Sequence, residues 1–179
     1  FRGLKWSALE GGTRVPCIIR FPGLIPAGEV TGKLTTAIDL LPTLASACGI
    51  KLKEGPGIVP KIDGLNLWAS LQGKTKTHPR NSLLYWHGWA MPQAIRVGDW
   101  KLYLDKVKEI PGTKKAPVLI DLSKDPAEEK DLASEYPEKV KDMKELAIEL
   151  LSEIGKNSIS LGGPPDPRKK SPKRGQWIP

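Results

Sequence analysis

Residues 93–105 read QAIRVGDWKLYLD, and this stretch decides the fold of the second half of the chain. Apolar and polar side chains alternate on both sides of Gly98-Asp99, a dipeptide that is typical of tight hairpin turns. Alternation with a period of two places successive side chains on opposite faces of a strand. The stretch therefore predicts two antiparallel strands joined by a turn at Gly98-Asp99.

Short apolar runs flank this hairpin on both sides. They read SLLYWHG at residues 82–88 and APVLIDL at residues 116–122, and both are rich in residues that favour strands. Four strands in succession indicate an antiparallel sheet, because strands joined by short turns run in opposite directions.

The clearest helix in the sequence follows the strands, at residues 138–155. Pro137 precedes it and Gly155 ends it, and both residue types are common at these helix positions. Its apolar residues recur at helical spacing and form one face: Val140, Met143, Leu146, Ala147, Leu150 and Ile154. A small antiparallel sheet needs an apolar cover on one face, so this helix is expected to pack on it.

The first half of the chain contains fewer elements. Residues 15–21, VPCIIRF, predict a buried strand. Residues 35–50 predict a helix with apolar residues at helical spacing, and Pro42 is tolerated if this helix begins near Asp39 or Leu40 and so has Pro42 in its first turn. Residues 63–74 predict a short helix with Leu67 and Leu71 facing inward. A lone strand and its helix need a larger sheet to join.

The formal charge of +8 over 179 residues raises the question of nucleic-acid binding. Positive and negative residues are interleaved along most of the chain, as on solvated faces. Only the tail at residues 156–179 concentrates positive charge, and it is expected to be a soluble end rather than a binding arm. No apolar run approaches the ~18 residues of a membrane span. We therefore expect neither a nucleic-acid partner nor a membrane span.

The cysteines and histidines form no metal-binding pattern, so no metal site is expected within this chain. Cys17 and Cys48 lie in apolar surroundings without a second Cys or His at ligand spacing. They are expected to be buried free thiols, with pairing in an oxidising compartment as the alternative. His78 lies in a polar loop and is expected to be solvated. His87 ends an aromatic run, where packing is favoured over a role in a pocket.

Lys5 stands five residues ahead of Glu10, Gly11 and Gly12. A Lys brings a compact positive charge to an anion, so Lys5 is a candidate anion-binding residue, although on chemistry alone an idle surface charge is favoured. Glu10 is expected to cap the glycine turn, and Arg14 to pair with Glu10 or with a helix end. These residues do not make a complete catalytic site.

Five segments, in this order over roughly residues 3–155, resemble the C-terminal part of sulfatases of the arylsulfatase type, in the alkaline-phosphatase-like superfamily. Any one of the matches is weak, and the ordered set is specific. The segments read KWSALEGGTRVPCIIRFPGLIPAG, AIDLLPTLASACGI, KIDGLNLWASLQGK, QAIRVGDWKLYL and LIDLSKDPAEEKDLASEYPE.

The resemblance implies an α/β fold, of α+β type for this portion. Residues 1–78 would form the end of an alkaline-phosphatase-like sheet, at the C-terminal end of the catalytic domain. Residues 79–155 would form a small domain in which a four-stranded antiparallel sheet is packed by a long helix, and residues 156–179 a basic, Pro-rich tail.

The resemblance also implies a parent enzyme that hydrolyses sulfate esters through a formylglycine nucleophile and Ca²⁺. The nucleophile motif and the Ca²⁺ ligands belong upstream of Lys5 in this family, so this chain is expected to be inactive alone. Lys5 matches the family's sulfate-binding Lys and is expected to contact the sulfate. His87 and Trp89 are expected to contact the substrate, because the loop at residues 87–92 can border the substrate cleft.

The implied partners are a sulfate-ester substrate, such as a sulfated carbohydrate, and the missing N-terminal sulfatase portion. The implied compartment is periplasmic, secreted or lysosomal. Trp6 stands where the family often has Gly, which alters the approach of Lys5 to sulfate. An alternative from another class is a non-catalytic interaction module that binds an acidic partner or a polysaccharide.

Overall fold

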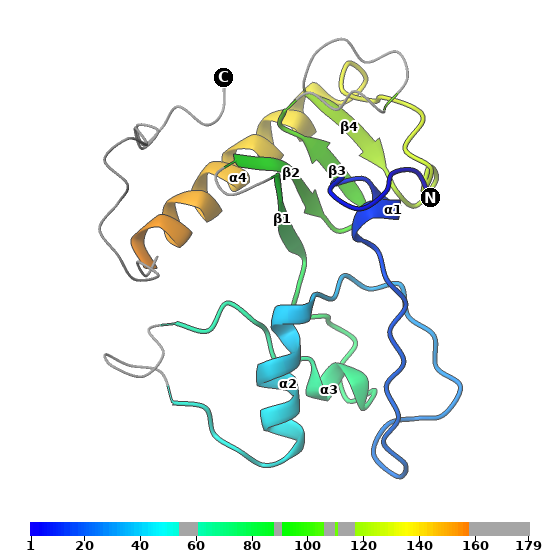
Figure 1. Cartoon of the computed structure of the whole chain (residues 1–179), viewed down its shortest axis with the longest axis vertical. Helices are drawn as coiled ribbons and strands as arrows, with labels where there is room; N and C mark the ends of the chain where they lie inside the picture. The colour runs from blue at the N-terminus through cyan, green and yellow to red at the C-terminus, as the bar shows by residue number, and fades with distance from the viewer. Residues whose placement is uncertain (54–60, 88–90, 106–109, 111–116, 158–179) are drawn as a thin grey trace. The chain divides into compact units, whose positions relative to one another are not determined.

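The computed structural model describes residues 1–53, 61–87, 91–105, 110 and 117–157. The chain divides into two compact units, one made of Phe1–Arg14 with Leu83–Pro179 and the other of Val15–Ser82. The elements of the described residues follow the chain in the order α1 (Glu10–Thr13), the 3₁₀ helix η1 (Ala37–Asp39), α2 (Leu40–Ala47), α3 (Trp68–Leu71), β1 (Ser82–His87), β2 (Met91–Val97), β3 (Trp100–Tyr103), β4 (Val118–Asp121) and α4 (Pro137–Asn157) (Figure 1).

The strands form one four-stranded sheet in the order β1-β2-β3-β4. Strands β2 and β3 are antiparallel, with Val97 opposite Trp100 across the turn that Gly98 enters at a φ of +57°. Strands β3 and β4 are also antiparallel, with Leu102 opposite Leu119. The predicted hairpin at Gly98-Asp99 and the predicted antiparallel sheet are confirmed.

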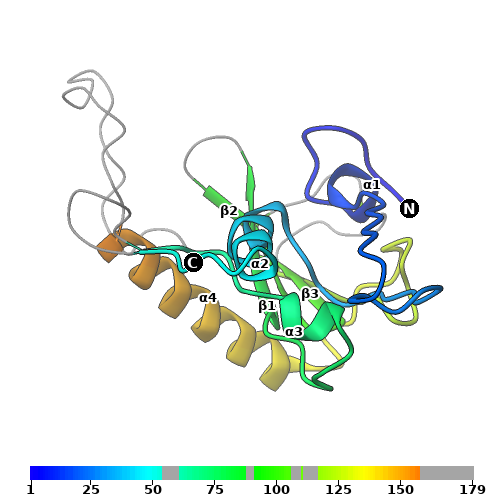
Figure 2. The ribbon, with the colours of Figure 1, turned by 90° about the horizontal axis from the view of Figure 1, so that it is seen from below.

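Helix α4 covers one face of this sheet. Ile95, Leu102 and Leu119 of three neighbouring strands pack with Met143 and Ala147 of the helix. Figure 1 and Figure 2 show α4 running alongside the sheet in both views. The predicted helix and its predicted role as a cover are therefore confirmed, but its predicted end at Gly155 is wrong, because α4 continues to Asn157.

Residues 1–14 cover the opposite face of the sheet. Ala8 and Leu9 are buried there in one apolar cluster with Tyr103 and Ile120. The sequence predicted only one cover, because this segment carries neither a strand pattern nor a long helical face. Both faces of the sheet are therefore shielded from water within the same unit.

The first predicted domain ends at residue 78, close to the observed division after Ser82. Residues 1–14, however, belong with the sheet and not with residues 15–82. The assignment of residues 1–78 to the end of a catalytic domain stays a prediction. The predicted tail lies outside the described residues from residue 158 onward.

The predicted strand over residues 15–21 is wrong for the chain as described. The structure assigns no strand to this segment, and the side chain of Ile18 is 95% exposed. A strand depends on a neighbouring strand for its backbone hydrogen bonds, and no described segment pairs with this one. Cys17 and Cys48 are both free and both exposed, so the expectation of buried thiols is wrong as well.

The helix predicted over residues 35–50 is present as η1 and α2, and Pro42 lies in the first turn of α2 as expected. On this helix Ala45 is buried, whereas Leu41 and Leu44 are exposed. The short predicted helix at residues 63–74 is reduced to the four residues of α3. None of the helices in the described ranges has the length and apolar character of a membrane span.

Candidate functional site

Lys5 lies at the second position of a tight turn over residues 4–7. The Ser7 N–H donates to the Leu4 carbonyl oxygen at 3.0 Å and closes the turn. Trp6, at the third position, has a φ of +75°, whereas Lys5 is not among the residues with positive φ. This combination defines a type II turn, in which the third position usually carries Gly. Gly, which the resemblance implies at this position, would therefore suit the backbone better than Trp6 does.

The side chain of Lys5 is exposed. Its Nζ lies 5.4 Å from the ring centroid of Trp6, within the range of a cation–π contact. None of the ion pairs formed between described residues includes Lys5. The ammonium group is thus exposed, and no carboxylate of the described residues pairs with it.

A pocket adjoins the turn within the same unit. Three of its lining residues are aromatic, and its lining consists of Trp6, Ser7, Ala8, Gly12, Thr13, Tyr85 and Trp86. The structure thereby brings Trp86 of β1 next to the turn that carries Lys5. His87, a predicted substrate contact, follows Trp86 as the last residue of β1. Trp89, the other predicted contact, lies outside the described residues.

Gly11 and Gly12 of α1 allow the backbone around Lys5 to pack closely against the helix. The Gly11 N–H donates to the Arg2 carbonyl oxygen at 2.7 Å. A Cβ on Gly11 would lie 2.5 Å from that oxygen, and a Cβ on Gly12 would lie 2.5 Å from the Leu4 carbonyl oxygen. Only Gly permits such an approach, so these residues shape the segment that carries the Lys5 turn.

Glu10, the first residue of α1, reaches into a buried group of charges. Its Oε1 accepts a hydrogen bond from Lys101 Nζ at 2.9 Å, and the same Nζ lies 3.0 Å from Glu128 Oε1. The backbone N–H of Glu10 donates to Glu128 Oε2 at 2.7 Å. The three residues are between 0 and 1% exposed. We call Glu10, Lys101, Glu128 and Tyr103 the Glu10 cluster.

The remaining contacts of the Glu10 cluster involve a phenol and a guanidinium group. The Tyr103 hydroxyl donates to Glu128 Oε1 at 2.5 Å, and Arg96 Nη1 lies 3.6 Å from Glu10 Oε2. Burial and the charge of Glu128 raise the pKa of Tyr103, and burial and the charge of Glu10 raise the pKa of Tyr85 to about 12. Both phenols therefore stay protonated at neutral pH, so Tyr103 remains a hydrogen-bond donor.

The Glu10 cluster was not predicted from the sequence. Only a pairing of Arg14 with Glu10 was expected, and the structure shows that pair at 3.8 Å. One signal was present: Lys101 and Tyr103 share a strand face through the period of two, opposite the face of Leu102. A Lys on a face that must be covered requires a buried carboxylate partner, but no pattern in the sequence identifies Glu128 as that partner.

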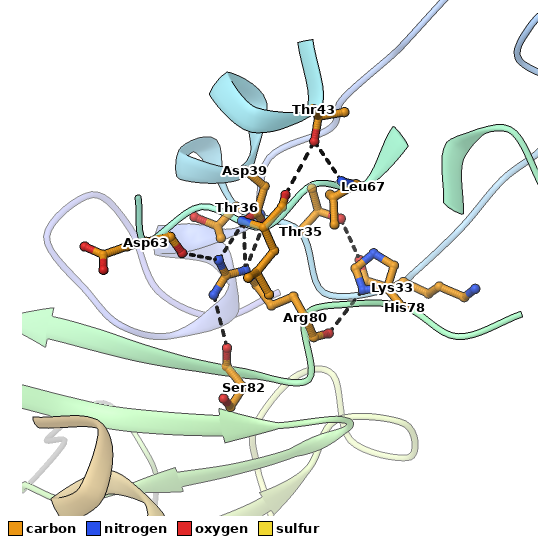
Figure 3. A network of polar contacts seen from close by, with 11 residues as sticks. Lys33, Thr35, Thr36, Asp39, Thr43, Asp63, Leu67, His78, Arg80 and Ser82 are labelled. Atoms are coloured by element: carbon orange, nitrogen blue, oxygen red, sulfur yellow. Dashed lines mark hydrogen bonds and ion pairs between the residues drawn. The ribbon is translucent and has the colours of Figure 1, made fainter. Parts of the chain in front are cut away.

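A second buried ion pair organises the unit of residues 15–82 (Figure 3). Arg80 donates three hydrogen bonds to Asp39, from Nη2 to Oδ1 at 2.6 Å and from Nε to Oδ2 at 2.8 Å and to Oδ1 at 3.1 Å. The backbone N–H groups of Thr36 and Leu65 also donate to Asp39. Burial raises the pKa of the Asp39 carboxyl, but these hydrogen bonds and the Arg80 charge outweigh it and hold the pKa below its ordinary value.

Both carboxylate oxygens of Asp39 accept hydrogen bonds from Arg80 and from backbone N–H groups. His78, expected to be solvated, is half-buried beside it, with Nδ1 3.1 Å from the Arg80 carbonyl oxygen. We regard this network as structural.

The described residues do not fit a calcium site of their own. Ca²⁺ takes about six to eight oxygen ligands, several of them from carboxylates. In the part of the chain that the structure describes, no group of three or more His, Cys, Asp or Glu is placed to hold a metal ion. The buried carboxylates of Glu10 and Glu128 are both occupied by Lys101.

Comparison with known proteins gives a family match over most of the chain. Residues 5–156 match the family model described as N-sulphoglucosamine sulphohydrolase, C-terminal. Human arylsulfatase A is 32% identical over 167 residues, which cover 80% of this chain and 32% of the relative. Human steryl-sulfatase is 32% identical over 156 residues, which cover 74% of this chain and 26% of that protein. The N-acetylgalactosamine-6-O-sulfatase of Bacteroides thetaiotaomicron is 30% identical over 155 residues, which cover 82% of this chain and 29% of that protein.

The chain thus spans about a quarter to a third of the length of these relatives. A solved structure from work on the metabolism of multiple glycosaminoglycans by Bacteroides thetaiotaomicron matches with a TM-score of 0.62 and 29% identity, over 85% of this chain and 32% of that one. The PsFucS1 sulfatase from Pseudoalteromonas sp. matches with a TM-score of 0.72 over 89% of this chain and 34% of that one. At 21% sequence identity, this match shows a shared fold and nothing more. The predicted fold class, α/β of the alkaline-phosphatase-like kind, is confirmed.

Proposed function

Because the chain belongs to the family of the C-terminal domain of N-sulphoglucosamine sulphohydrolase, we propose that it is the C-terminal part of an enzyme that hydrolyses sulfate esters. The observation that carries this proposal is the family match over residues 5–156, which begins at Lys5 itself. The exposed ammonium group of Lys5 supports it, because among the described residues this group contacts the Trp6 ring but no carboxylate, so an anion can approach it without breaking an ion pair there.

Lys5 is assigned the role of contacting a sulfate oxygen. Negative charge builds up on the sulfate and on the leaving oxygen as the ester bond breaks, and a fixed positive group beside it lowers the barrier. The described residues supply neither a nucleophile in its motif nor a calcium site. Formylglycine and Ca²⁺ are therefore proposed to belong to parts of the enzyme other than this chain, which is expected to be inactive alone.

The substrate is proposed to be a sulfated carbohydrate. The pocket beside Lys5 offers the aromatic rings of Trp6, Tyr85 and Trp86, and such rings bind the apolar faces of sugar rings. His87 and Trp89 are proposed to extend this surface as substrate contacts. One relative is named for a sulfated sugar, N-acetylgalactosamine 6-O-sulfate, which favours the same class. A periplasmic, secreted or lysosomal compartment stays a prediction.

The test uses the longest natural protein that contains this chain, produced together with a formylglycine-generating enzyme. Sulfate release is measured from an aryl sulfate and from sulfated monosaccharides, with the isolated chain assayed in parallel. We expect release by the longer protein and none by the chain alone. A longer protein that binds a sulfated polysaccharide but releases no sulfate from any substrate would be an interaction module, and the proposed function would be wrong.

A further inference from the structure

The Glu10 cluster joins two segments that lie far apart in the sequence. Lys101 of β3 contacts carboxylate oxygens of both Glu10 and Glu128, and Arg96 and Arg14 lie within 4 Å of Glu10 as well. Removal of Lys101 would leave the buried carboxylate of Glu128 without the cation that it contacts. The cluster therefore holds α1 and the loop of Glu128 on the sheet in one arrangement.

Glu128 itself is held in a strained conformation. Its φ is +59°, in the left-handed region that residues with a side chain seldom adopt. Such a conformation persists only where surrounding contacts determine it. Here the contacts are the Tyr103 hydroxyl, Lys101 Nζ and the Glu10 N–H, which together occupy both carboxylate oxygens of Glu128.

The Lys5 turn has little packing of its own. The side chains of Leu4 and Trp6, on either side of Lys5, are each 81% exposed. What holds the turn is the backbone of α1, through the Gly11 N–H on the Arg2 carbonyl and the close approach of the Leu4 carbonyl to the second glycine. The position of Lys5 therefore follows the position of α1.

Two kinds of contact fix α1 on the sheet. Ala8 and Leu9 supply apolar burial, which is not directional and tolerates rotation of the helix. Glu10 supplies charged hydrogen bonds of 2.7 to 2.9 Å, which are directional. The charged contacts therefore set the orientation of α1, and with it the orientation of the Lys5 turn.

We propose that the Glu10 cluster fixes the orientation of Lys5, and that Lys101 and Glu128 are positioning residues for sulfate binding although neither touches the substrate. This inference rests on the proposed function. The C-terminal sheet then serves the reaction by holding the turn of the sulfate-contacting Lys.

The first arm of the test measures kinetics in the longest natural protein that contains the chain. Glu128→Gln keeps the shape of the side chain, Lys101→Met removes the ammonium group, and Lys101→Arg restores the charge. Lys130→Met is the matched control, because Lys130 forms an exposed ion pair with Glu135 at 3.1 Å. We expect kcat/KM to fall on the order of 100-fold in Lys101→Met, mainly through kcat, as for a displaced catalytic group. Lys101→Arg is expected to recover part of the loss, and Lys130→Met to match the parent.

The second arm measures amide hydrogen exchange and needs no activity. The amides of Ser7 and Gly11, which bond to the Leu4 and Arg2 carbonyls, are expected to lose protection in Glu128→Gln and Lys101→Met. The amide of Leu104, which bonds to Gln93 within the sheet at 2.9 Å, is expected to keep its protection.

Unchanged amide exchange at Ser7 and Gly11 would overturn the inference. An equal loss of protection at the Leu104 amide would also overturn it, because the cluster would then have a purely structural role. If Lys101→Met does not fold, the exchange and kinetics of Glu128→Gln decide the question. If the parent protein releases no sulfate, the proposed function fails, while the exchange pattern still shows whether the cluster orients the Lys5 turn.

Discussion

Lys5 is proposed to act through its positive charge. Because its side chain is exposed, its removal should lower activity without lowering stability. Lys5→Ala is expected to lower kcat/KM by about 100-fold or more, the usual cost of removing one group that stabilises charge in the transition state. Because the side chain is exposed, the free energy of unfolding should change by less than about 0.5 kcal/mol. Sulfate release and denaturant unfolding, each measured on the same protein, check the two parts.

The control for Lys5→Ala is Lys124→Ala, which removes another exposed cation, 81% accessible, from its ion pair with Asp121. This variant is expected to keep the parent's kcat/KM. Full activity in Lys5→Ala would remove Lys5 from the site.

Trp6 and Glu128 are the two non-glycine residues with positive φ among the described residues. Substitution by glycine is expected to change the free energy of unfolding in opposite directions at the two positions. Trp6→Gly is expected to raise the free energy of unfolding by about 1 kcal/mol, because the strain is relieved and the exposed ring loses few contacts. Glu128→Gly relieves the same strain but leaves Lys101 with less compensation, so it should destabilise by about 3 kcal/mol or more. Chemical unfolding of both variants measures the contrast, and a destabilised Trp6→Gly would contradict it.

At the scale of elements, α1 depends on its glycines. Gly11→Ala places a Cβ against the Arg2 carbonyl oxygen and is expected to destabilise the chain by about 2 kcal/mol, as for an overpacked site. Gly32→Ala is the control, because no atom lies within 4 Å of its Cβ position and its φ is not positive. Thermal unfolding of the two variants tests this difference, and equal midpoints would refute the close packing around α1.

The elements that the sequence predicted well are those whose signal is local. The hairpin at Gly98-Asp99 follows from alternation and turn chemistry, and α4 follows from one apolar stripe. Residues 15–21 have the composition of a strand but no described partner strand, and a strand exists only as part of a sheet. The cover of the second sheet face escaped prediction because Ala8 and Leu9 carry no periodic pattern.

One part of the candidate site, Lys5, was predicted from the sequence, and the contacts of Glu10 were not. Lys5 was found through a family motif and not through its chemistry, since an exposed Lys is ordinary in any sequence. The contacts of Glu10 with Lys101 and Glu128 span 91 and 118 residues, and no local pattern reports a pairing across such separations.

At the scale of the whole molecule, each of the two units contains its own buried ion pair. In the unit of residues 15–82, Asp39 has a pKa held below its usual value of 3.8 by Arg80 and two backbone N–H groups. A carboxyl with a lowered pKa contributes stability that is present above the unfolded value and is lost as pH falls through the folded value. The parent should therefore lose stability as the pH falls below about 3.8.

The matched variant for this pH dependence is Asp39→Asn. It should be less stable than the parent at neutral pH, because Arg80 loses its charged partner, and the difference should shrink as the pH falls below about 3.8. Urea unfolding of both proteins between pH 7 and pH 2 checks this expectation. A difference that stays constant over this range would show that Asp39 does not titrate with the unfolding of this unit.

The separation between Glu10 and its partners also sets the order of events during biosynthesis. The segment of Lys5 leaves the ribosome before the partners of Glu10, because Lys101 follows Glu10 by 91 residues and Glu128 follows it by 118 residues. At about 5–20 residues per second, this delay is roughly 5–25 s. A nascent chain interrupted before β3 would contain the whole sequence of the Lys5 turn without the residues that orient it. The proposed sulfate contact is therefore assembled late in translation, although it is encoded at the beginning of this chain.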